Sequence, residues 1–230
     1  MCIRDRVCAH RMQWDNCKMK SIPRENCNLY MECNSLNQED KMDDGSLEQI
    51  RSKTKATIQS WSETCGLAPE GVTDKFDAAM LNWMNDLTDS LDIWIAKSLD
   101  MTDGELILAW TNLGALVECW LRFFYCAYYE DYMKSPKLGK KGKPLEPDDK
   151  AMTFDYLIQY SKGILWDSLQ DPLYLWVCQI QHYRNAIHAF SYREIGHPSD
   201  FILNIGQYLL FVDEVIDRLP PIEDYRQDLL

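Results

Sequence analysis

From Leu47 onward, apolar side chains recur every three or four residues, and this repeat limits most strongly what the chain can fold into. Residues at this spacing share one face of an α-helix, whereas a half-buried strand would alternate apolar and polar residues. No strand-like alternation of useful length occurs, so an all-α fold is predicted. The clearest repeat is formed by Ile202, Ile205, Leu209, Val212, Ile216 and Leu219.

Pro, Gly and helix-capping residues divide the repeat into separate helices. The strongest start signal is Asp171-Pro172, an N-cap residue followed by Pro at the first helical position. Apart from 134–147 the connections are short, so we expect an antiparallel bundle of about five to six helices. The expected helices cover 47–65, 74–94, 103–133, 148–164, 171–195 and 199–219.

The first forty residues show neither helical nor strand periodicity. Met1 to Arg6 resembles a translated sequencing-adapter artefact, and Met31 or Met42 would then be the true start. A cysteine-rich metal-binding tail is the alternative, but no C-x-x-C pair is present, and zinc sites usually need one. The predicted organisation is a disordered or non-native leader over 1–41, an N-terminal helix and linker over 42–71, and a helical bundle over 72–230.

Composition narrows the class of protein further. The chain is 46% apolar with eight Trp, enough for a core, and its formal charge of −12 should repel nucleic acid. The one basic patch is 134–147, with five lysines; it is either a solvated loop or a loop that steers RNA. The longest apolar run, Leu106 to Tyr129, is interrupted by Glu118 and Arg122, so no membrane span is expected.

The cysteines bear on the compartment. Cys119, Cys126 and Cys178 lie among apolar neighbours in predicted helices. Buried free thiols are typical of a reducing environment, so we expect a cytoplasmic protein.

One segment, Arg184 to His188, carries chemistry that a packed helix does not need. On a continuous helix Arg184 and His188 would lie on one face about one turn apart, at the edge of an apolar stripe. An arginine there needs an anion or water. An ordinary ion pair and a packed histidine are one interpretation. The other is a phosphate site, with His188 as general acid or base, Arg184 stabilising phosphate charge and Asn185 orienting a group. No cofactor or metal is implied, because no ligand cluster has suitable spacing near them.

Glu118 is the second unusual residue, because it lies in the middle of the apolar helix over 103–133. Arg122 lies four residues later, so a pair within the helix is one interpretation. In the other, Glu118 reaches across the bundle and holds the guanidinium of Arg184.

Three segments together resemble the HEPN superfamily, and more narrowly a group of HEPN-like bacterial proteins. They are Asn112 to Glu118, Tyr128 to Tyr132 and Tyr183 to Phe190, and the resemblance covers about residues 72–219. It implies a helical bundle that usually dimerises, and in many members a ribonuclease of a toxin–antitoxin or antiviral system.

The family motif is an Arg, a polar residue and a later His, which Arg184, Asn185 and His188 match in type. Three residues separate Arg184 from His188, one fewer than the motif's minimum. The resemblance leaves two functions open, and a purely structural helical protein without a site is the third alternative. One is a metal-independent endoribonuclease that acts as a homodimer on RNA, with Glu118 in support and with an antitoxin protein as a partner. The other is a non-catalytic module that binds a partner protein or a nucleotide.

Overall fold

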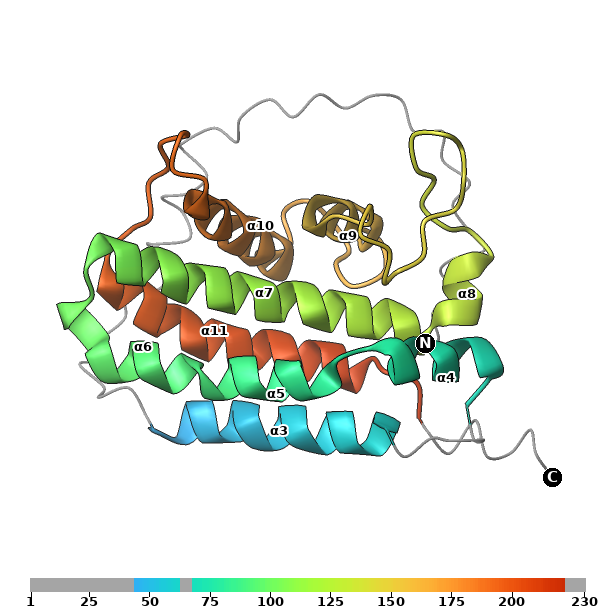
Figure 1. Ribbon diagram of the computed structural model, residues 1–230, viewed down its shortest axis with the longest axis horizontal. Coiled ribbons are helices and arrows are strands. Elements are labelled where there is room, and N and C mark those ends of the chain that lie inside the picture. The colour runs from blue at the N-terminus through green and yellow to red at the C-terminus, as the bar shows by residue number, and fades with distance from the viewer. Residues whose placement is uncertain (1–43, 63–67, 222–230) are drawn as a thin grey trace.

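A computed structural model of the protein describes residues 44–62 and 68–221, and every named element in that part of the chain is a helix (Figure 1). The predicted all-α bundle is confirmed. The predicted leader over 1–41 lies outside the described residues. The elements are α3 (Asp44–Ser62), α4 (Glu70–Ala78), α5 (Leu81–Asp89), α6 (Leu91–Lys97), η1 (Ser98–Asp100), α7 (Asp103–Ala127), α8 (Tyr129–Met133), α9 (Phe154–Tyr160), α10 (Pro172–Arg184), η2 (Asn185–Ile187) and α11 (Pro198–Asp217).

Successive helical segments of the bundle alternate in direction, as short connections predict. In Figure 1, α3, α7 and α11 run in one direction, and the segments α4–α6 and α9–α10 run in the opposite direction. Contacts along α7 and α11 show the same direction for these two helices, because Trp110 packs on Phe201 and the Trp120 indole donates to the Tyr208 hydroxyl at 3.0 Å. The α3 helix belongs to the same core, since Ile50 and its neighbours are buried with the residues of α7 and α11.

The central helix is α7, which contacts α11 and both oppositely directed segments, α4–α6 and α9–α10. By length and composition it is the one helix of the described chain that could cross a membrane. Most of its apolar stretch is buried inside the bundle, and Trp110, Val117 and Phe124 are fully covered. A core helix of a bundle has the same composition, so its apolar character is accounted for by packing.

Two predicted helices are interrupted. The chain is extended at Ala79, so the single helix expected over 74–94 is instead α4, α5 and α6. The break shifts the buried face: Met84 and Leu91 are buried, while Met80 and Trp83, which an uninterrupted helix would place on one face with Leu87, are exposed. The helix expected over 103–133 is likewise divided between α7 and α8, and that expected over 148–164 is only α9.

Capping residues account for the starts of α10 and α7. Asp171 caps α10, with its carboxylate accepting from the Leu173 N–H at 2.9 Å and Pro172 in the first turn, as predicted. Thr102, and not Asp103 one residue later, caps α7 in a reciprocal capping box with Glu105. Thr102 has the extended backbone that an N-cap residue needs, and this leaves the Asp103 carboxylate at the surface.

Candidate functional site

The end of α10 differs from the prediction. A helix was expected from Asp171 to about residue 195, but α10 ends at Arg184 and one 3-10 turn follows over Asn185–Ile187. The chain must reverse to reach α11. The Trp110 indole holds the returning loop by donating to the Ile195 carbonyl at 2.9 Å. Ile187 and Phe190, two apolar residues of the expected helix, reach no core, since Ile187 is 46% exposed and Phe190 is fully exposed. Arg184 and His188 therefore do not share a helix face.

Arg184 is held by an ion pair across the bundle. Its Nη2 lies 2.7 Å from Oε2 of Glu118, whose side chain is only 13% exposed, whereas the Arg184 side chain is 31% exposed. The other carboxylate oxygen of Glu118 accepts from Nε and Nη2 of Arg122, at 3.2 and 2.8 Å. Both predicted partners of Glu118 are thus present. The carboxylate holds one N–H edge of the Arg184 guanidinium, while part of that side chain remains exposed.

Arg122 has a different environment, although it shares Glu118. It donates to the backbone carbonyls of Pro147, Asp149 and Met152, at 2.7, 3.3 and 2.5 Å. These bonds satisfy its donors within the fold and tie the segment before α9 to α7. Arg122 is a structural arginine, and Arg184 is the one with donors left to offer.

The close approach of α10 to α7 requires Gly114. A Cβ atom at this position would lie 2.6 Å from Cβ of Arg184 and 2.8 Å from its Cγ and Cδ. The guanidinium also lies over the Phe154 ring, with its carbon 5.5 Å from the ring centroid. Gly114, Glu118 and Phe154 therefore form a cradle, contributed by α7 and α9, that sets the position of the Arg184 side chain.

Asn185 and His188 occupy the turn after α10. Asn185 is half-buried at the end of the helix, and its carbonyl accepts from the His188 N–H at 3.3 Å. His188 is exposed, and in the described part of the chain no hydrogen bond joins its side chain to that of Arg184. The structure thus brings Arg184 and Glu118 together. His188, four residues after Arg184 in the sequence, lies at the surface.

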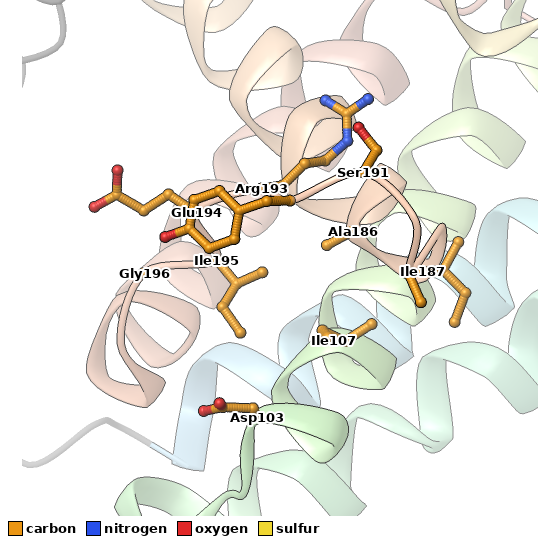
Figure 2. Close-up of a pocket in the computed structure, with 11 residues that line it drawn as sticks. Asp103, Ile107, Ala186, Ile187, Ser191, Arg193, Glu194, Ile195 and Gly196 are labelled. Carbon is orange, nitrogen blue, oxygen red and sulfur yellow. The ribbon is translucent and has the colours of Figure 1, made fainter.

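An open pocket of about 550 Å³ lies beside this turn (Figure 2). Sequence reasoning missed it, because its walls come from distant parts of the chain: the first turns of α7 and the segment from η2 to α11. In Figure 2 Asp103 and Arg193 lie at opposite ends, with Ile107 and Ile195 between them. The lining residues are Asp103, Ile107, Ala186, Ile187, Ala189, Ser191, Tyr192, Arg193, Glu194, Ile195 and Gly196.

The cysteines in described helices are unsuited to nucleophilic chemistry. Burial raises the pKa of Cys119 to about 11 and that of Cys126 to about 12. A thiol with such a pKa stays protonated at neutral pH, and the thiolate is the reactive form. Across the residues that the structure describes, no group of three or more His, Cys, Asp or Glu side chains is arranged to hold a metal ion.

The basic segment over 134–147 forms a small hairpin. Leu138 pairs with Pro144, and the Gly139 N–H donates to the Lys143 carbonyl at 2.9 Å. Its base is fastened to the bundle by the Tyr132 hydroxyl, which donates to the Leu145 carbonyl at 2.6 Å. In Figure 1 this hairpin lies at the opposite end of the bundle from the loop after α10.

Comparison with known proteins gives no match: no protein-family model, no curated protein and no solved structure is similar to the chain. Its function therefore has to follow from the geometry and chemistry of the site.

Proposed function

We propose that the chain is a HEPN-like protein that contacts an RNA phosphate through Arg184 and cleaves RNA without a metal ion, with Asn185 and His188 completing the site. The observation that carries the proposal is the 2.7 Å ion pair between Arg184 and Glu118, made by an arginine whose side chain remains 31% exposed. A cation fixed on one side and open on the other is preorganised for an incoming anion. We propose RNA cleavage as the reaction because Arg184, Asn185 and His188 match the HEPN motif in residue type.

The chemistry requires one base, one acid and a cation. The 2′-hydroxyl loses its proton to an imidazole, its oxygen bonds to the adjacent phosphorus, and the bond from phosphorus to the 5′-oxygen breaks as that oxygen is protonated. The products are a 2′,3′-cyclic phosphate and a 5′-hydroxyl. His188 is exposed and free to approach RNA, and in a homodimer a second copy of it would supply the other proton transfer. Arg184 stabilises the charge that develops on the phosphate oxygens.

A non-catalytic module that binds a nucleotide or a partner protein is the second candidate. It is favoured by the end of α10 at Arg184, which leaves His188 on a separate turn with no hydrogen bond to Arg184 within the described residues. Binding needs only the fixed cation, whereas catalysis needs both side chains at one phosphate.

Cleavage of bulk RNA separates these two functions. The purified wild-type protein with EDTA present is expected to cleave RNA, and His188→Ala is expected to lower the rate by about a hundredfold or more, because general acid–base groups contribute on that scale. His197→Ala is the matched control, since His197 is also exposed but lies at the start of α11. Intact RNA at high protein concentration would leave only the binding module.

The wider setting is part of the same proposal. A ribonuclease of a toxin–antitoxin or antiphage system would act in the cytoplasm and be silenced by an antitoxin protein. Wild-type protein would then slow the growth of cells that express it, and the Arg184→Ala, His188→Ala double variant would not.

A further inference from the structure

The open pocket beside the 3-10 turn has the volume of a small-molecule site. Its volume of about 550 Å³ lies in the range typical of small-molecule pockets, roughly 300–1,000 Å³. Ile107 of α7, Ala186 of η2 and Ile195 of the returning loop give it an apolar floor (Figure 2). A flat, largely apolar group is the kind of ligand that such a floor accommodates.

The two ends of the pocket carry opposite charges, Asp103 at one and Arg193 at the other, and the third charged lining residue, Glu194, has its carboxylate turned away from the Arg193 guanidinium in Figure 2. Asp103 is exposed in the first turn of α7, and it forms no ion pair with another described residue. Arg193 lies at the other end, beside Ser191 in Figure 2, and its Nε is buried without a hydrogen-bond partner. A ligand that donates at one end and is anionic at the other matches this arrangement. A phosphate near Asp103 would be repelled, so the orientation is set.

Two aromatic rings extend into solvent on the same loop. Tyr192 lines the pocket and is 93% exposed, and Phe190 is fully exposed. Rings in such positions gain nothing from the core, but they can stack on unpaired nucleobases, which present flat faces of similar size. Base-paired RNA cannot use them, because its bases are already stacked.

From this arrangement we infer that the pocket binds one unpaired, amino-bearing base of single-stranded RNA, namely adenine, cytosine or guanine. The exocyclic amine donates to the Asp103 carboxylate, the adjoining phosphate lies at Arg193, and Tyr192 and Phe190 stack on this base and its neighbour. Uracil has no exocyclic amine, so Asp103 discriminates against it. The inference rests on the proposed contact with RNA, and it places the base next to the turn that carries His188.

Binding of short oligonucleotides tests the inference separately from cleavage. Fluorescently labelled 2′-O-methyl hexamers of A, C or U lack the attacking hydroxyl, so affinity is measured without turnover. Wild-type protein is expected to bind the A and C hexamers about tenfold more tightly than the U hexamer. Asp103→Asn is expected to remove most of that preference, since an amide can turn to either donor or acceptor. Glu70→Gln, an exposed acid in the first turn of α4, is the matched control and should keep it.

The aromatic and basic residues are expected to act on all hexamers alike. Tyr192→Ala should weaken binding about tenfold without changing base preference, because stacking is tolerant of sequence. Arg193→Gln should weaken binding and flatten its dependence on salt, because a phosphate contact is lost.

Several results would overturn the inference. Equal affinity for all three hexamers, or an unchanged preference in Asp103→Asn, would show that no base enters the pocket, even if the protein cleaves RNA. Loss of self-association in Tyr192→Ala and Phe190→Ala, with hexamer binding intact, would assign the rings to an interface between copies. Base-selective binding with no cleavage of bulk RNA would support the pocket and remove only the catalytic part of the proposed function.

Discussion

Glu118→Gln is expected to lower the free energy of unfolding by about 2–3 kcal/mol, because the change leaves two arginines without their shared anion. Removing one partner of a fully buried pair costs more, but the side chains of Arg122 and Arg184 are 24% and 31% exposed, and water compensates for part of the loss. Urea unfolding of the wild type and the variant measures this difference.

The chain offers a matched control for this change. Glu214 of α11 pairs with Arg218 four residues later, and both side chains are more than a third exposed, at 39% and 35%. Glu214→Gln should therefore cost less than about 1 kcal/mol. Similar losses for the two variants would mean that the Glu118 carboxylate is screened like a surface group and does not organise the site.

Gly114→Ala is expected to destabilise the bundle by about 1–3 kcal/mol, because the new methyl group would overlap the Arg184 side chain close to its backbone. The overlap forces α10 away from α7 and also weakens the ion pair with Glu118. This sign is unusual, since replacing a glycine inside a helix by alanine normally stabilises it.

Gly206 provides the comparison. It lies inside α11, and a Cβ there would meet open space. Gly206→Ala should stabilise the protein by about 0.5–1 kcal/mol under the same conditions. If Gly114→Ala were also stabilising, the close approach of the two helices would have no structural role.

Local patterns predicted the parts of the fold that depend on neighbouring residues. The three- and four-residue repeat identified the helices, and Asp171 marked the start of α10. The pairing of Glu118 with Arg184 was also within reach of the sequence, because a lone arginine on an apolar stripe needs an anion. Capping and helical burial act within a few residues, so they are readable without the fold.

The features that were wrong or missed depend on contacts between distant segments. The segment that returns after α10 is held by the hydrogen bond between Trp110 and Ile195, which are far apart in sequence. The pocket joins Asp103 to the segment around Arg193 in the same way. An apolar residue such as Phe190 looks like a core residue until the surrounding fold shows that nothing covers it.

The two arginines that share Glu118 allow the central claim to be tested directly. Arg122 donates to backbone carbonyls within the fold, while the Arg184 side chain remains 31% exposed, so removing each arginine is expected to have a different effect. The measurement is the affinity of folded Arg184→Gln and Arg122→Gln protein for a single-stranded 2′-O-methyl oligonucleotide, with unfolding by urea measured alongside. Arg184→Gln is expected to weaken binding by about tenfold or more, on the scale of a lost charge-assisted hydrogen bond, while Arg122→Gln lowers stability and leaves binding unchanged. Equal affinity of both variants and the wild type would contradict the claim that Arg184 is held in place to contact an RNA phosphate.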